Sequence, residues 1–502
     1  MSKRLVIKGV SFTYLSQFVT LLYGIISLPL LLQHFGTSLY GLWVLIFTLV
    51  SYLNNLSFGV PLAMSAIVAK TANQNEKYQV LKKSVFTLLC MAVFVLVAFL
   101  LATYFHSNWI ISFLGRVPSQ DALLAKEVFT ALLLITLIKM PFNLYSQFFT
   151  GMNLVYMTQV YTTLTAMINL LTVLLVVFLH LDMLWFAVLI MSGQFCISFI
   201  SFLHVLLKFA YLKRAACADK PVKSSLIFKS SCAFFQVGVA ATLVWSTDNL
   251  VISHFISAAA VTPYAVAFKI FSYLFLTFAM INTVVAPLYG NAFADKNLPR
   301  ANYIFSNILN LLPILAGFLW IGFIFFAQEA IHLWTHNPAA FGGYFLIFSL
   351  GFSGYLSTYI SIYAGLVQGM NWASKTLKVT WAEGILNPLL SIAFVIPFGV
   401  GGVAFGNAIA TLVTGFLFLP RYIKKLSQGE IICRFGFLAK HFGFLVLPCL
   451  GLSLLSIYLA SQWLKIICFV PIGILYFFIS WKLLDEPSRL VAKKLIKREK
   501  NV

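Results

Sequence analysis

The stretches FFTGMNLVY, at 148–156, and LVQGMNWAS, at 366–374, both place the triplet Gly-Met-Asn where an apolar run stops. Gly151 and Gly369 open the two triplets, an offset of 218 positions. Three further polar pairs share this offset: Asn169 with Asn387, Thr158 with Thr376, and Thr162 with Thr380. Glycine and asparagine suit a tight connection after a helix, because both tolerate left-handed backbone. The shared offset predicts an internal repeat whose two copies turn at equivalent places.

The composition places most of the chain in a lipid bilayer. Of the 502 residues, 61% are hydrophobic and only 9% are charged, whereas a soluble domain carries about 25% charged residues. The net charge of +21 first suggests a nucleic-acid partner. The basic residues, however, fall in short clusters between apolar runs and form no basic domain, so we expect no nucleic-acid partner.

About fourteen apolar runs are long enough to cross a membrane, since a span needs roughly 20 mostly apolar residues. The predicted spans are 10–33, 39–66, 84–105, 127–149, 153–180, 184–207, 231–257, 262–290, 303–327, 341–367, 376–396, 402–423, 437–460 and 464–484. The basic residues test this prediction. With the N-terminus inside the cell, the outer segments hold only Arg116, Lys126 and Lys465. This positive-inside pattern predicts that both termini are cytoplasmic.

The repeat and the charge pattern together predict the architecture. Spans one to six map onto spans seven to twelve, and both copies cross the membrane in the same direction because six is even. The predicted fold is an all-α integral membrane protein with about 14 transmembrane helices. Two parallel six-helix bundles surround a central cavity, and two extra helices follow at the C-terminus. The predicted domains are an N-terminal bundle at 1–207, a basic cytoplasmic linker at 208–230, a C-terminal bundle at 231–424, additional helices at 425–484 and a basic cytoplasmic tail at 485–502.

Three stretches carry a family resemblance: LPLLLQHFGTSLYGLWVLIFTLVSYL at 28–53, STDNLVISHFISAAAVTPYAVAFKIF at 246–271, and NPLLSIAFVIPFGVGGVAFGNAIAT at 387–411. They resemble Wzx-type polysaccharide transporters, the O-antigen flippases of the multidrug/oligosaccharidyl-lipid/polysaccharide exporter superfamily. The resemblance implies alternating-access transfer of an undecaprenyl-diphosphate-linked oligosaccharide to the periplasmic leaflet of the bacterial inner membrane. It also implies membrane lipids, a polysaccharide polymerase and chain-length machinery as partners.

Four ionisable residues lie inside predicted spans: Lys139, Asp248, Lys269 and Glu383. Each costs roughly 2.5–3.5 kcal/mol in the bilayer on insertion scales, so each marks a candidate functional position. Asp248 and Lys269 lie at similar depth on helices joined by a short loop, and two interpretations stay open. They form a structural salt bridge, or Lys269 joins Lys139 in the central cavity.

In the functional interpretation, the ammonium groups of Lys139 and Lys269 attract a diphosphate and acidic sugars. The amides of Asn54 and Asn282 are further predicted cavity ligands. Asp248 or Glu383 binds a proton or a sodium ion in exchange. Amides inside spans also join helices by hydrogen bonds, and Asn169 with Asn387 is the predicted structural pair.

No catalytic group or metal site is predicted. His332 and His336 have the i, i+4 spacing of helical metal ligands, with Glu329 nearby, but Pro338 follows and the segment is expected to be an outer loop. No Gly-rich phosphate-binding motif occurs, so ATP chemistry is not expected in this chain. We expect no bound cofactor. Coupling to a proton gradient, coupling to a sodium gradient and transport without coupling all stay open.

Two other function classes stay open. A cation-coupled multidrug exporter of the same superfamily would use an acidic or aromatic cavity, whereas the buried set here includes two lysines. A membrane-bound polysaccharide polymerase or glycosyltransferase would need catalytic groups on sizeable loops. The longest predicted outer loop, at 106–126, carries no dense polar cluster.

Overall fold

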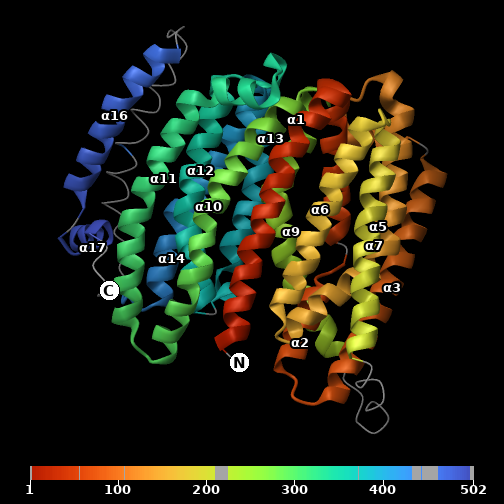
Figure 1. Ribbon diagram of the computed structural model, residues 1–502, viewed down its shortest axis with the longest axis horizontal. Helices are drawn as coiled ribbons and strands as arrows, with labels where there is room; N and C mark the ends of the chain where they lie inside the picture. The colour runs from red at the N-terminus through yellow and green to blue at the C-terminus, as the bar shows by residue number, and fades with distance from the viewer. Residues whose placement is uncertain are drawn as a thin grey trace. The chain divides into compact units, whose positions relative to one another are not determined.

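Helices form nearly all of the described chain. The computed structural model describes residues 3–55, 57–106, 108–209, 224–370, 372–431, 443, 462–484 and 486–497. No strand occurs in these ranges (Figure 1), which confirms the predicted all-α class. The predicted span at 437–460, apart from residue 443, and most of the predicted linker at 208–230 lie outside the described residues.

The helices follow the order of the predicted spans. They are α1 (Lys3–Asn55), α2 (Val60–Lys70), α3 (Gln74–Phe105), α4 (Trp109–Leu114), η1 (Ser119–Asp121), α5 (Ala122–Gly151), α6 (Val155–Phe178), α7 (Met183–Lys208), α9 (Ser224–Phe255), α10 (Val261–Ala294), α11 (Leu298–Thr335), η2 (Pro338–Ala340), α12 (Tyr344–Gly369), α13 (Ala373–Thr411), the π-helical η3 (Leu412–Phe418), α14 (Leu419–Leu426), α16 (Gln462–Leu483) and α17 (Glu486–Lys497).

Nine helices in the described ranges are long and apolar enough to cross a membrane. Two of them, Ser11–Tyr52 and Lys375–Leu426, each cover two predicted spans. The chain is therefore a multi-pass membrane protein, and the total of about 14 spans stays a prediction.

Two long helices, α1 and α13, each cover two predicted spans and bend at a glycine between them. Gly36 has φ 72° within α1, and Gly399 has φ 60° within α13. Glycine reaches positive φ without the steric penalty that a Cβ atom would add. The chain thus changes direction at a single residue and the helix continues on both sides.

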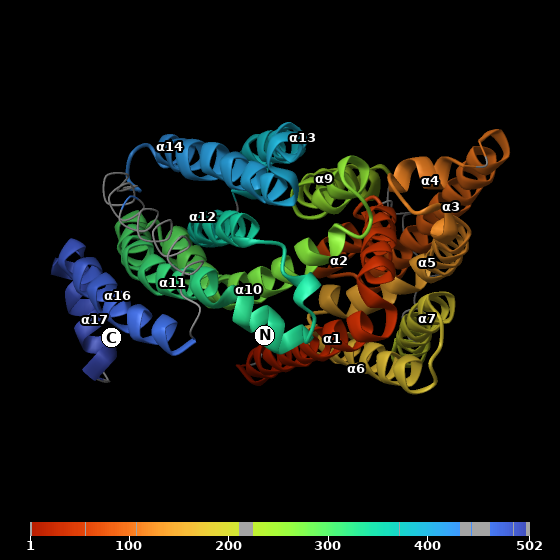
Figure 2. The same ribbon diagram turned by 90° about the horizontal axis from the view of Figure 1, so that it is seen from above.

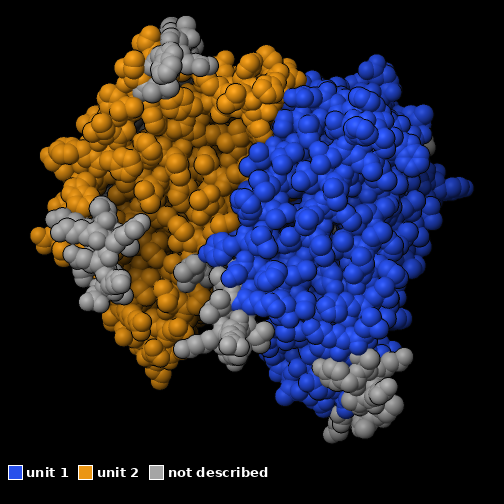
Figure 3. All heavy atoms as spheres, in the orientation of Figure 1, with its two compact units in different colours: residues 1–242, 253–262 blue, residues 243–252, 263–502 orange. Residues whose placement is uncertain are grey.

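The chain divides into two compact units (Figure 3). Unit 1 comprises 1–242 and 253–262, and unit 2 comprises 243–252 and 263–502. Within unit 1, α5 packs against α1, α2, α3, α6 and α7, and α1 packs along α6. The helix that carries Lys139 is therefore surrounded by the other helices of its unit.

The first Gly-Met-Asn triplet ends α5 with a Schellman motif. Asn153 takes the left-handed conformation, with φ 60°. Its N–H donates to the Thr150 carbonyl at 3.0 Å, and the N–H of Leu154 donates to the Phe149 carbonyl at 2.8 Å. These bonds satisfy carbonyls that the end of the helix leaves free. A Cβ on Gly151 would lie 3.0 Å from the Ser65 carbonyl oxygen of α2, so glycine also permits a close helix contact.

The second triplet repeats this construction in unit 2. The N–H of Trp372 donates to the Val367 carbonyl at 2.8 Å, the same bond displaced by the offset of 218. A Cβ on Gly369 would lie 2.4 Å from the Ala286 carbonyl oxygen of α10. Asn371 itself lies outside the described residues. Each triplet therefore ends a helix and lies where that helix closely approaches another helix of its unit. The other helix is α2 in unit 1 and α10 in unit 2.

Unit 2 is built around the packing of α12 on α11 and α13. Small residues of α12 admit large side chains of α11: Trp320 is fully buried against Gly354, and Ile324 lies against Gly351. Small residues allow such close packing in membrane helices. Both α16 and α17 pack on α11, as Figures 1 and 2 show.

We expect Gly354→Ala to destabilise unit 2, because its new Cβ would lie 2.4 Å from the ring of buried Trp320. Overpacking of this kind costs about 1–3 kcal/mol. The matched control is Gly322→Ala on α11, whose Cβ would lie 3.5 Å from Phe469, an ordinary contact. Thermal unfolding of the full chain in detergent should show a lower midpoint for Gly354→Ala only; equal midpoints for the two variants would contradict the packing.

Candidate functional site

A polar cavity of about 290 Å³ lies inside unit 1, between α1, α5, α6 and α7. Lys139 and Asn143 line it from α5, Thr162 from α6, Gln194 from α7 and Tyr23 from α1. Lys139 is the charged residue of this lining, and no acidic residue belongs to it among the described residues. The structure therefore places a predicted cavity lysine in a cavity within a single unit.

Helical periodicity brings the polar residues of this cavity together. On α6 the lining residues stand at 158, 161, 162, 165, 166 and 169. Residues three and four apart share one helix face, so Thr158, Thr162, Thr165 and Asn169 of this apolar helix point the same way. Asn143 and Ser146 follow Lys139 on α5 with the same spacing. Three polar faces meet and enclose the cavity.

Lys139 ends a chain of hydrogen bonds across three helices. Its ammonium donates to Gln194 Oε1 at 2.7 Å, and Gln194 Nε2 donates to Asn169 Oδ1 at 3.3 Å. Ser198 Oγ, one turn after Gln194, donates to Asn143 Oδ1 at 2.9 Å. The amide of Gln194 therefore fixes the position of the ammonium group but leaves its charge without a neutralising partner in the described part of the chain.

Lys269 occupies a different environment. It lies in α10, and its Nζ is 5.6 Å from the ring centroid of Tyr273, one turn further along the helix. Lys269 does not line the cavity at Lys139. A common cavity that contains both lysines stays a prediction.

Asp248 forms the centre of a second polar cluster, in unit 2. The carboxylate is 2% exposed and accepts hydrogen bonds from the Tyr264 hydroxyl, from Asn407 Nδ2 and from Ser391 Oγ, the last at 3.4 Å. The Ser391 hydroxyl shares its single hydrogen between Asp248 and Asn407 Oδ1, which is closer, at 3.1 Å. The cluster joins α9, α10 and the two arms of α13, which bend back on each other at Gly399.

The interpretation of Asp248 and Lys269 as a structural salt bridge was wrong, because Tyr264 takes the place of the lysine. Tyr264 stands in the first turn of α10, and its long side chain reaches Asp248 on α9. Lys269 follows five residues later, which turns it roughly 140° around the helix axis at 3.6 residues per turn. The two side chains therefore point to different sides of α10.

The other predicted residues separate into three cases. Glu383 Oε1 accepts a hydrogen bond from Thr411 Oγ1 at 3.2 Å within unit 2. Asn169 joins α6 to α7 through Gln194, as expected of a structural amide, whereas buried Asn387 has no hydrogen-bond partner among the described residues. The side chains of Asn54 and Asn282 lie outside the described part of the structure.

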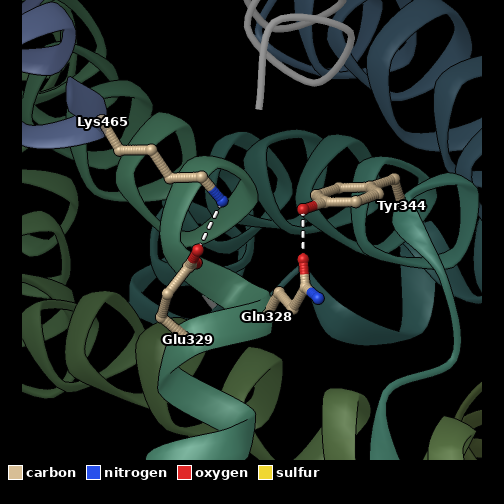
Figure 4. Close-up of polar contacts among 4 residues, drawn as sticks. All are labelled: Gln328, Glu329, Tyr344 and Lys465. Atoms are coloured by element: carbon tan, nitrogen blue, oxygen red, sulfur yellow. Dashed lines mark hydrogen bonds and ion pairs between the residues drawn. The ribbon is translucent and has the colours of Figure 1, made fainter. Parts of the chain in front are cut away.

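The region of His332 holds an ion pair. Figure 4 shows Glu329 of α11 directed at Lys465 of α16, and the two form a salt bridge. Beside it, the Tyr344 hydroxyl donates to Gln328 Oε1 at 2.5 Å. No group of three His, Cys, Asp or Glu side chains able to hold a metal ion occurs in the described ranges. Glu329 fastens α16 to α11.

Sequence reasoning missed Gln194, Ser391 and Asn407. The signal for Gln194 was present, because polar residues recur at helical spacing within apolar α5, α6 and α7. Ser391 and Asn407 are 16 positions apart and meet only because α13 bends at Gly399. Periodicity along one helix does not reveal a contact that depends on a bend.

The chain combines a multi-pass helical fold with a polar cavity and with buried charges inside its helical units. Its sequence matches the family described as "Polysaccharide biosynthesis protein" over residues 6–293, more than half of the chain. The chain belongs to this family of polysaccharide biosynthesis proteins.

The known proteins that this chain resembles are named as transporters or flippases. The "Putative O-antigen transporter" of Salmonella typhi is 20% identical over 430 residues, which cover 83% of this chain and 95% of the relative. The lipid II flippase MurJ, in its inward closed conformation, has a TM-score of 0.69 at 16% identity and covers 97% of this chain and 100% of its own. An inward-facing multidrug resistance MATE transporter of the MOP superfamily has a TM-score of 0.66 at 16% identity. The match covers 82% of this chain and 95% of the transporter. Such identities show a shared fold.

We expect Glu329→Gln to destabilise the chain more than Lys465→Met does. The side chain of Lys465 is 4% exposed and that of Glu329 is 25% exposed, so loss of the glutamate leaves a charge that water does not reach. The expected cost of Glu329→Gln is about 1–3 kcal/mol, between the values for surface and buried pairs. Thermal unfolding in detergent measures the two single variants and the double variant.

The double variant should regain part of the stability lost in Glu329→Gln, because no unpaired ammonium remains. An additive loss in the double variant would show that the ion pair does not hold α16 on α11.

Proposed function

We propose that the chain is a flippase that moves an undecaprenyl-diphosphate-linked oligosaccharide, an O-antigen or capsule repeat unit, across the bacterial inner membrane. Transfer runs from the cytoplasmic to the periplasmic leaflet by alternating access, and both termini are cytoplasmic. The observation that carries this proposal is the ammonium of Lys139, buried in a polar cavity whose described lining holds no acid. Such a site favours an anionic, hydroxyl-rich substrate.

The comparisons support the same substrate class. A relative bears the name of an O-antigen transporter, and a protein of the same fold is a lipid II flippase. A polysaccharide polymerase and chain-length machinery are proposed as partners, since they would use the transferred repeat unit.

A cation-coupled multidrug exporter is the second candidate, favoured by the likeness to a multidrug transporter fold. The cavity of unit 1 argues against cationic drugs. At about 4 Å two like charges repel each other by roughly 4 kcal/mol at an effective dielectric constant of about 20. Lys139 would therefore exclude the cations that such an exporter carries.

We expect Lys139→Ala and Lys269→Ala each to reduce translocation, because each removes a charge-assisted hydrogen bond of about 1.5–3 kcal/mol, roughly a 10- to 100-fold effect. Proteoliposomes with a fluorescent lipid-diphosphate oligosaccharide measure the rate. Lys126→Ala is the control, because Lys126 bonds to Asn108 in an exposed position of the same helix as Lys139. Full activity of both test variants would refute the cationic-site proposal.

Asp248 is the proposed coupling residue. Its cluster supplies oxygen atoms from a carboxylate, a phenol, a hydroxyl and an amide, which are hard ligands suited to sodium or a proton. Glu383, the second candidate, has one hydroxyl partner.

We expect Asp248→Asn to abolish the acceleration of translocation by an imposed sodium or proton gradient. The reason is that the neutral amide removes the charge that binds the cation. The same proteoliposomes, with each gradient set separately, measure the response. Glu383→Gln is the matched comparison, and a gradient response that survives in Asp248→Asn but disappears in Glu383→Gln would transfer the role to Glu383.

A further inference from the structure

The cavity of unit 1 has one charged end and a long neutral body. Lys139, Asn169 and Gln194 are linked by hydrogen bonds and therefore share one level. Toward the connection at 151–154, the walls carry Thr158 and Ser201. From Asn169 to Thr158 the lining extends about 16 Å along α6, at 1.5 Å per residue.

The volume of this cavity distinguishes it from a polar contact that only joins helices. Amides and hydroxyls that only join helices would pack against each other, whereas these enclose about 290 Å³. Pockets for small ligands begin at about 300 Å³. The volume suits one sugar ring and is too small for several.

The lining chemistry favours a polyhydroxylated ligand. Hydroxyl groups of Thr162, Thr165 and Ser198 and the amides of Asn143 and Gln147 face the cavity. Hydroxyls and amides both donate and accept hydrogen bonds, as sugar hydroxyls require. Thr162 and Thr165 donate to carbonyls of their own helix and Ser198 donates to Asn143, so each hydroxyl oxygen keeps lone pairs that can accept from a sugar hydroxyl. An acyl or isoprenoid chain cannot use this remaining hydrogen-bonding capacity.

The charge at the Lys139 end of the cavity selects among sugars. One ammonium among neutral groups balances one negative charge, because the lining contributes no second cation in the described part of the chain. A diphosphate brings more negative charge than Lys139 alone can neutralise, and burying that excess is costly. A single carboxylate matches the site.

We propose that the unit-1 cavity binds one carboxylate-bearing sugar residue, with the carboxylate on the Lys139 ammonium and the ring hydroxyls on the α6 and α7 side chains. The proposal rests on the proposed function, since the sugar would belong to the translocated oligosaccharide. It assigns Lys139 to selection of the sugar and leaves the diphosphate to other groups.

The test compares two probes that differ in one group, methyl β-D-glucuronide and methyl β-D-glucoside. Saturation-transfer NMR on the detergent-solubilised full chain measures both dissociation constants. We expect the glucuronide to bind roughly 10- to 100-fold more tightly, the value of a charge-assisted hydrogen bond of about 1.5–3 kcal/mol. In Lys139→Gln the ratio should fall to near one, and in Lys126→Gln it should stay unchanged.

A second variant guards against misfolding of Lys139→Gln. Thr165→Val keeps the shape of the side chain and removes one cavity hydroxyl, so it should weaken both probes and preserve their ratio. Equal affinity of the two probes for the unaltered chain would overturn the proposal. Competition by sodium acetate as effective as that by the glucuronide would also overturn it, since the site would then recognise only the carboxylate.

Translocation measured on the same preparation separates this inference from the proposed function. Absent glucuronide binding with intact translocation removes the sugar site and leaves the flippase. Glucuronide binding without translocation of any lipid-diphosphate oligosaccharide supports the site and removes the flippase.

Discussion

The hydrogen bonds of the backbone govern this structure, because a bilayer offers no water to an exposed N–H or C=O group. Long helices satisfy most of these groups, and the difficult places are the points where a helix ends or turns. At the ends of α5 and α12, an N–H five residues ahead caps a carbonyl near the helix end, at Phe149 and Val367. At Gly36 and Gly399 the chain turns without a loop. At Asn153, Gly36 and Gly399 the solution depends on a residue that takes a positive φ.

The same shortage of water explains where the polar side chains lie. Lys139 of unit 1 faces amides and hydroxyls, and Asp248 of unit 2 faces a phenol, an amide and a hydroxyl. Unit 1 therefore holds a buried ammonium and unit 2 a buried carboxylate, each with neutral hydrogen-bond partners among the described residues. A coupled flippase needs both kinds of site, one for an anionic substrate and one for a cation. In the proposed function, unit 1 would supply the first kind of site and unit 2 the second.

The sequence predicted the all-α membrane class, the order of the helices and the repeat, because apolar runs and the offset of 218 depend only on local patterns. It also identified Lys139 and Asp248, since a charge inside an apolar run is conspicuous. Their hydrogen-bond partners could not be predicted from the sequence. Tyr264, and not Lys269, bonds to Asp248 because the two residues lie on different sides of α10. Asn407 lies close to Asp248 because α13 bends at Gly399. Rotation and bending of helices are settled by tertiary packing, which local patterns do not record.

The position of the Lys139 ammonium also bears on membrane leakage. A polar cavity inside a membrane protein is a potential route for sodium ions and protons. Positive groups in narrow pores exclude such ions, and at about 5 Å the repulsion from one ammonium is roughly 3 kcal/mol at an effective dielectric constant of about 20. In the proposed flippase, this charge would let unit 1 hold a hydrophilic substrate without dissipating the electrochemical gradient of the cell.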